Sequence, residues 1–114
     1  IKEPGWALNW ARLLALKVEA REWDSRFSMA LHEAESLGGW QPTIQSAVLN
    51  ATLPYRESIT PSDQLVMLNL AQKGLRQSKS FMVSLLNYYD ELPWVCGQMT
   101  SMKGADVSFC HAGQ

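Results

Sequence analysis

The sequence lacks an excess of charge of either sign, and it has no block of like charges. Ten Lys and Arg residues stand against eleven Asp and Glu residues, and no five consecutive residues carry one sign. Duplex nucleic acid requires a basic binding face, so we expect no nucleic-acid partner. No window approaches the roughly 20 consecutive apolar residues of a membrane-spanning helix. Hydrophobic residues nevertheless make up 46% of the chain, which is enough for a single core.

Cysteine and histidine are also scarce. Cys96 and Cys110 do not form a CxxC pair, and His32 and His111 do not complete zinc-ligand spacing. We therefore expect neither a metal site nor a cofactor. A disulfide between the two cysteines is one hypothesis, and it requires an oxidising compartment. The alternative hypothesis is that no disulfide forms and that Cys96 is a small buried apolar residue. The C-terminal end then packs through four apolar side chains, Met99, Met102, Val107 and Phe109.

Strand-like alternation extends over no more than four residues, whereas helical spacing of apolar residues recurs along the chain. This pattern predicts an all-α fold in which about five helices form antiparallel hairpins. The expected helices lie at about residues 6–21, 25–37, 42–53, 61–77 and 80–92, with Pro93 ending the last. Residues 97–114 show no helical period, which predicts an irregular, non-helical C-terminal tail after a helical domain over residues 1–96.

The first expected helix has a ridge of small residues beside a ridge of bulky ones. Ala7, Ala11 and Ala15 recur every four residues, and small side chains allow a partner helix to approach closely. Trp10 and Leu13 match the W-x2-L opening of a tetratricopeptide repeat, although the following positions depart from it. The pattern therefore favours a tetratricopeptide-like superhelical stack, with any small helical bundle as the alternative.

Two helix starts carry clear capping signals. Asp24 is a good N-cap for the second helix. Thr60 is followed by Pro61 at the first helical position and by Asp63 three residues after the cap, a pattern that resembles a capping box with Asp in place of Glu.

The stretch ESLGGWQP joins the second and third expected helices. Gly38 is expected to end the second helix in the left-handed conformation, and Gly39 to allow a sharp turn. Pro42 fits the first turn of the third helix. Trp40 lies between them, and we interpret it as a structural plug at the end of the first hairpin, with a sugar-stacking platform as the alternative.

A longer stretch, residues 5–45, resembles the C-terminal part of VpsP-type exopolysaccharide biosynthesis proteins. The resemblance rests on Trp23-Asp24 with Phe27, on Ala30-Leu31, and on Leu37-Gly38-Gly39-Trp40-Gln41-Pro42 with Gln45. It continues through Gly74-Leu75 and Gln77 to the LPWVC segment, and so covers about residues 4–96. The resemblance implies a tetratricopeptide-like fold, a periplasmic location in a Gram-negative bacterium, and an inner-membrane anchor upstream of this chain.

The expected function is that of a non-enzymatic scaffold for a protein partner in a polysaccharide assembly system. A carbohydrate-binding module is the alternative, because tryptophan is abundant. We expect no catalytic residue, since Glu33 and Glu35 point to different sides of a helix and His32 has no nucleophile in a recognisable context. Trp6 or Leu13 is expected to be partly exposed or to lie in a dimer contact, so the first helix is a candidate homodimer surface.

Overall fold

The computed structural model describes residues 5–100 of the chain. Over this range it contains six α-helices, one 3-10 helix and no strand, which confirms the all-α prediction. The elements are α1 (Gly5–Glu19), α2 (Ser25–Gly38), α3 (Pro42–Thr52), η1 (Leu53–Ser58), α4 (Pro61–Gln77), α5 (Lys79–Tyr88) and α6 (Leu92–Thr100).

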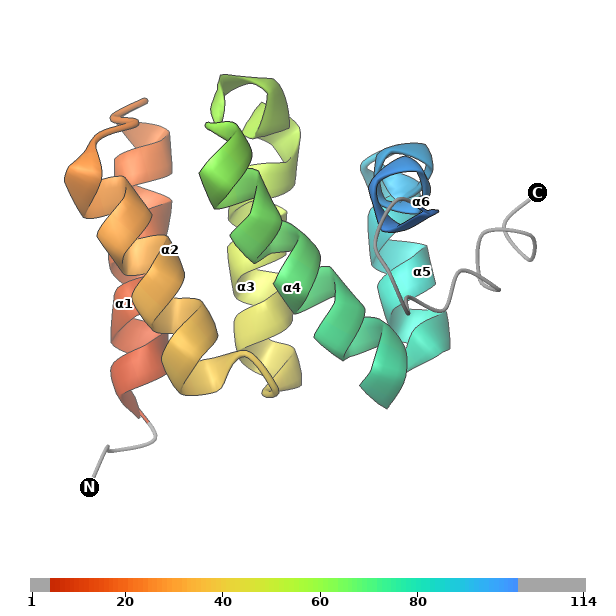
Figure 1. Cartoon of the computed structure of the whole chain (residues 1–114). Helices are drawn as coiled ribbons and strands as arrows, with labels where there is room; N and C mark the ends of the chain where they lie inside the picture. The colour runs from red at the N-terminus through yellow and green to blue at the C-terminus, as the bar shows by residue number, and fades with distance from the viewer. Residues whose placement is uncertain (1–4, 101–114) are drawn as a thin grey trace.

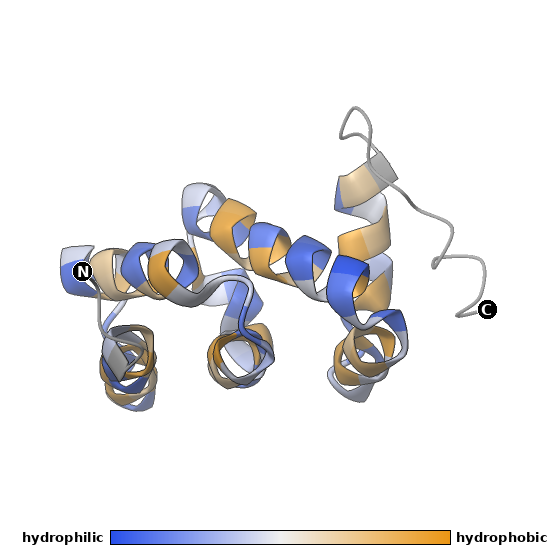
Figure 2. Cartoon of the chain, turned by 90° about the horizontal axis from the view of Figure 1, so that it is seen from below, coloured by the Kyte–Doolittle hydropathy of each residue, from blue (hydrophilic) through white to orange (hydrophobic). Residues whose placement is uncertain are grey.

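The helices form two rows. Helices α1, α3 and α5 are seen end-on in one row in Figure 2, while α2 and α4 lie across them in the second row. The chain rises through α1, descends through α2 and continues to alternate through α5, and α6 is seen end-on above α5 (Figure 1). Helix α1 packs against α2 and α3, and α4 packs against α2, α3 and α5.

The core lies between the two rows. Its largest fully buried side chains include Leu14, Phe27, Leu31, Leu49, Met67 and Leu86. In the small ridge of α1, Ala7 and Ala11 are buried, and so are Ala30 and Ala34 of α2, whereas Ala15 is only half-buried. Trp10 is half-buried against this core.

The prediction that Gly38 takes the left-handed conformation is wrong. Among residues 5–100, the non-glycine residues with a left-handed backbone are Arg21, with φ 57°, and Asp90, with φ 56°, and Gly38 does not have a positive φ. Gly38 is the last residue of α2, and Gly39 has ordinary helical angles of −60° and −23°. Glycine is needed at position 38 because there is no space for a side chain. An added Cβ would lie 2.7 Å from Ala7 Cβ and 2.8 Å from Ile44 Cγ1. This position therefore sets how closely α2 approaches α1 and α3.

The C-terminal part also differs from the prediction. Helix α5 ends at Tyr88, and Pro93 lies in the first turn of α6 instead of ending a helix. Proline is tolerated there because the first backbone N–H groups of a helix have no intrahelical partner. Residues 97–100 are helical and not part of an irregular tail, since Val95 and Met99 form a buried stripe one turn apart. Residues 55–60 were expected as a loop, but residues 55–58 belong to η1.

Both predicted N-caps are confirmed. Asp24 Oδ1 accepts a hydrogen bond of 3.0 Å from the backbone N–H of Phe27, and Thr60 Oγ1 accepts one of 3.3 Å from Asp63. Asp24 Oδ2 also accepts from Lys17 Nζ at 2.9 Å. This hydrogen bond from Lys17, with the backbone bond from Phe27, holds the pKa of Asp24 below its ordinary value of 3.8.

Replacing Asp24 by asparagine (D24N) tests this pairing. The amide side chain retains a capping oxygen, but its nitrogen cannot accept a hydrogen bond from Lys17. Because the folded pKa of Asp24 is lowered, its contribution is present above the unfolded value and is lost as the pH falls through the folded value. We expect the wild type to melt above D24N at pH 7, with the difference closing below about pH 4. Thermal melts from pH 7 to pH 2.5 measure this, and a difference that does not change with pH would contradict the assignment.

Candidate functional site

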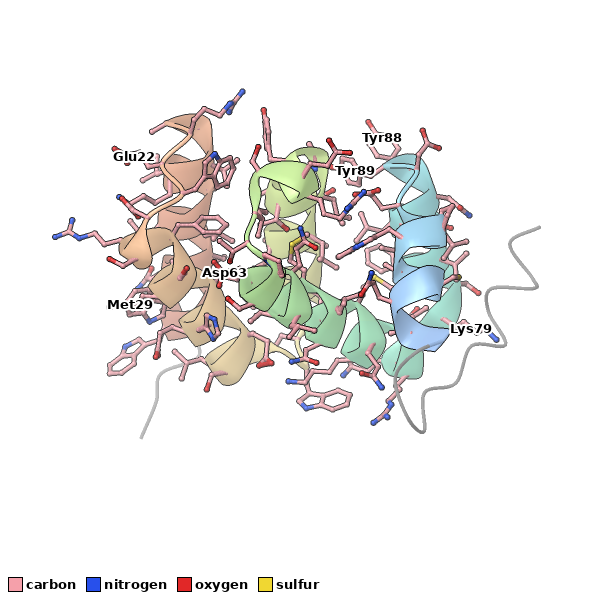
Figure 3. All side chains as sticks on the ribbon, turned by 45° about the horizontal axis from the view of Figure 1, so that its top comes forward. Glu22, Met29, Asp63, Lys79, Tyr88 and Tyr89 are labelled. Atoms are coloured by element: carbon pink, nitrogen blue, oxygen red, sulfur yellow. The ribbon has the colours of Figure 1, made fainter. Side chains whose placement is uncertain are left out.

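Polar side chains bridge α2 and α4 along their contact, which we call the α2–α4 seam. At one end, Asp63 is 3% exposed and lies between the two helices (Figure 3). Its carboxylate accepts from Ser28 Oγ at 2.5 Å and lies 3.3 Å from His32 Nε2. The side chain predicted to complete a capping box therefore turns toward α2 instead.

The order of these three groups decides what they can do. The Asp63 carboxylate contacts both Ser28 and His32, whereas in a nucleophilic triad the imidazole stands between the hydroxyl and the carboxylate. His32 is thus not placed to take a proton from Ser28 through the hydrogen bonds of this cluster. The cluster instead satisfies a buried carboxylate and joins two helices.

The other end of the seam opens into a pocket of about 300 Å³, here called the Trp40 pocket. Its lining comprises Glu35, Trp40, Asn69, Gln72, Lys73 and Arg76. Lys73 Nζ lies 3.2 Å from Glu35 Oε2 and 5.4 Å from the centre of the Trp40 ring. The pocket thus combines an aromatic surface, two amides and three charges.

The interpretation of Trp40 as a plug is wrong, because its side chain is 50% exposed. The loop is fixed instead by two glutamines. Gln45 Nε2 donates to Gly39 O at 2.8 Å and to Gln77 Oε1 at 2.8 Å, and Gln77 Nε2 donates to Trp40 O at 2.6 Å. The backbone of residues 39 and 40 is therefore held while the ring remains open to solvent.

The structural role of Gln45 was not predicted, although its position in the sequence carries a signal for it. Gln45 lies on the apolar side of α3 with Ile44, Val48 and Leu49, and it is 1% exposed. A glutamine buried among apolar residues needs hydrogen-bond partners nearby. The identity of those partners, Gly39 and Gln77, was not readable from the pattern.

A second hollow lies between η1 and the turn that joins α5 to α6, and three of its polar side chains, Arg56, Tyr89 and Glu91, are already paired. The Arg56 guanidinium forms an ion pair with Glu91 and lies 4.8 Å from the centre of the Trp94 ring. Tyr89 Oη donates to Asn50 Oδ1 at 2.6 Å. These contacts join η1 and α3 to α5 and α6, and we interpret them as structural.

The remaining predicted residues are placed as follows. Trp23 stacks edge-on against Phe27 with ring centres 5.1 Å apart, so the structure brings these two hairpin residues together. Pro42 opens α3 as predicted. Cys96 is half-buried on α6, whereas Cys110 lies outside the described residues, so their disulfide stays a prediction. Met99 is buried, while the tail positions Met102, Val107 and Phe109 lie outside the described part.

Residues 5–100 contain no group of three or more His, Cys, Asp or Glu side chains arranged to hold a metal ion. Within the same range, no helix has the length and apolar character needed to cross a bilayer. The chain matches no protein family, no curated protein and no solved structure.

Proposed function

We propose that this protein is a non-enzymatic, tetratricopeptide-like scaffold that binds a protein partner through the Trp40 pocket. Following the sequence resemblance, we place that partner in an exopolysaccharide assembly system and the complex in the periplasm, with an inner-membrane anchor upstream. The half-exposed ring of Trp40 on a fixed loop carries the proposal.

The two-row arrangement supports the repeat part of the proposal. In helical-repeat proteins each unit packs mainly on its neighbours, and there is no global core. Here α1 packs on α2 and α3, whereas α5 has its larger contacts with α4 and α6. This is the contact pattern of a stack whose units follow one another along the chain.

The fixed loop supports the binding part. Interface hot spots are enriched in tryptophan, and rigid anchors lose less conformational entropy when a partner binds. Gln45 and Gln77 hold the backbone of the loop before any partner arrives, and Lys73 lies over the Trp40 ring. An anchor prepared in this way is suited to recognition.

The charges of the pocket indicate which partner segment fits. Lys73 is paired with Glu35, whereas Arg76 is exposed and has no carboxylate partner among the described side chains. The pocket therefore keeps one uncompensated positive charge beside an aromatic ring. We propose that it takes a segment carrying an acidic residue next to an apolar one.

Carbohydrate binding is the second candidate function. The observation that favours it is the same exposed Trp40 ring, surrounded by Asn69, Gln72, Glu35 and Arg76, which offer hydrogen bonds to hydroxyl groups. Against it, one cation already lies over the ring and restricts stacking.

A photoreactive amino acid at Asn69, which lines the pocket, tests the proposal in cells that make the full-length protein. Irradiation is expected to join it to a protein of the polysaccharide machinery. The matched control is the same group at Asn87, an exposed asparagine on α5. Adducts to glycan alone would favour the second candidate, and equal protein adducts from both positions would contradict the proposal.

With the captured protein purified, replacing Trp40 by Ala is expected to weaken its binding by about 30-fold or more, the loss typical of a hot spot. Replacing Phe81, which is 48% exposed on α5, by Ala controls for loss of any exposed aromatic side chain. Equal losses in the two variants would place the binding site elsewhere.

A further inference from the structure

One side of the α1–α2 pair carries exposed apolar side chains, flanked by two charged ones, that no described residue covers. We call it the outer face, and define it by Trp6, Leu13, Arg26, Met29 and Glu33. Trp6 is 46% exposed and Met29 is 54% exposed, and Figure 3 shows Met29 on the side of α2 remote from α4. Trp6 and Glu33, together with Trp10 and Leu37, line a shallow hollow of about 320 Å³ between the two helices.

The two charged side chains of the outer face are arranged regularly. Arg26 and Glu33 lie seven residues apart on α2, which is two turns or about 10 Å along the same side of the helix. Met29 lies about midway between them. Neither charged side chain has an ion-pair partner among residues 5–100.

We propose that a second copy of this chain covers the outer face, with a two-fold axis next to Met29. A two-fold axis places two copies of α2 antiparallel, so residue 26 of one copy stands opposite residue 33 of the other. Arg26 then pairs with Glu33 twice, on either side of the two Met29 side chains. Trp6 of α1, which lines the hollow beside Glu33, is placed to add apolar area at the rim of this contact.

The charge pattern is what selects a second copy over other occupants. A membrane surface would call for several basic residues on the face. Binding of a different protein would not require one positive and one negative charge at equal distances from an apolar centre. A self-complementary surface requires that arrangement, because each pair must occur twice.

This inference is independent of the Trp40 pocket. Glu35, which lines that pocket, lies on the α4 side of α2, whereas Met29 lies on the side away from α4. The dimer therefore leaves the pocket open. A W40A variant is expected to remain dimeric, so a failed partner-binding test and a failed dimer test remain distinguishable.

Charge reversal at the two positions gives a sharp test. The wild type is expected to sediment at twice the chain mass of 12.8 kDa at micromolar concentration. Arg26→Glu and Glu33→Arg each place like charges opposite one another, and each is expected to weaken dimerisation by at least about tenfold. An equimolar mixture of the two variants restores opposite charges at both contacts and is expected to form heterodimers. The double variant R26E/E33R is likewise expected to dimerise.

Circular dichroism of each variant checks that the fold is retained. The mixture is a second control for folding, because misfolded variants would not regain dimerisation when they are combined. The proposal would be overturned if the wild-type protein sediments as a monomer at about 100 µM, because this concentration is far above the dissociation constant of a specific dimer. A mixture no more dimeric than its separate components would also overturn it, since a two-fold contact through Arg26 and Glu33 must recover.

Discussion

Replacing Phe27 by Ala is expected to lower the free energy of unfolding by about 3–5 kcal/mol. The ring of Phe27 is 1% exposed and packs edge-on against Trp23, whose ring lies 5.9 Å from that of Tyr55 in η1. Truncation therefore leaves a cavity where α2 and η1 meet, and the surrounding helices relax only partly into it. Urea unfolding followed by circular dichroism measures the change.

Phe81→Ala is the matched control for this result. It removes the same atoms from a ring that is 48% exposed on α5, so the expected change is within about 1 kcal/mol. If the two variants lose equal stability, the burial of Phe27 is not what stabilises this part of the fold.

Replacing Gly38 by Ala is expected to lower stability by about 1–3 kcal/mol. This loss is expected although alanine has a higher helix propensity than glycine, by up to about 1 kcal/mol. The added methyl group would lie 2.7 Å from Ala7 Cβ, an atom close to the α1 backbone that cannot swing aside. Helix α1 must then shift away from α2, and buried contacts such as those of Leu14 loosen with it.

Gly97→Ala separates this crowding from the general effect of the substitution. Gly97 lies inside α6, and the Cβ added there has no atom of the described structure within 4 Å. The variant is expected to gain about 0.5–1 kcal/mol through helix propensity. Thermal melts of both variants report the signs directly, since 1 kcal/mol shifts the melting temperature by about 4–8 °C in a domain of this size. A gain in both variants would show that the space at Gly38 is not limiting.

The restricted space at Gly38 also bears on the proposed site. Helix α2 can end against Ala7 and Ile44 only because residue 38 has no side chain. The chain then leaves the core at Gly39, and Gln45 and Gln77 hold the next two carbonyl groups. The Trp40 ring projects from this fixed backbone into the pocket. The short loop after α2 therefore allows close helix packing and also presents the exposed Trp40 ring.

The features that arise from neighbouring residues could be predicted from the sequence. The N-caps at Asp24 and Thr60, the helical stripes and the burial of Ala7 and Ala11 were all predicted and are observed. Each of these depends on groups within one or two helical turns, so the pattern carries the physical cause. The all-α class followed from the same local signals. The stack type and the biological role stay proposals because they do not follow from local signals.

The contacts between groups that are distant in the sequence depend on how the helices pack. Asp63 reaches Ser28, Gln77 reaches Trp40 O, and Arg56 reaches Glu91, across separations of 35, 37 and 35 residues. The crossing of the helices sets these pairings, and no local periodicity encodes that crossing. The same packing explains two differences from the predictions. Gly38 is needed for close helix contact and not for a left-handed helix end, and the Trp40 ring is exposed. A polar side chain can be recognised as needing a partner from sequence, but only the packed helices determine which partner lies within hydrogen-bond distance.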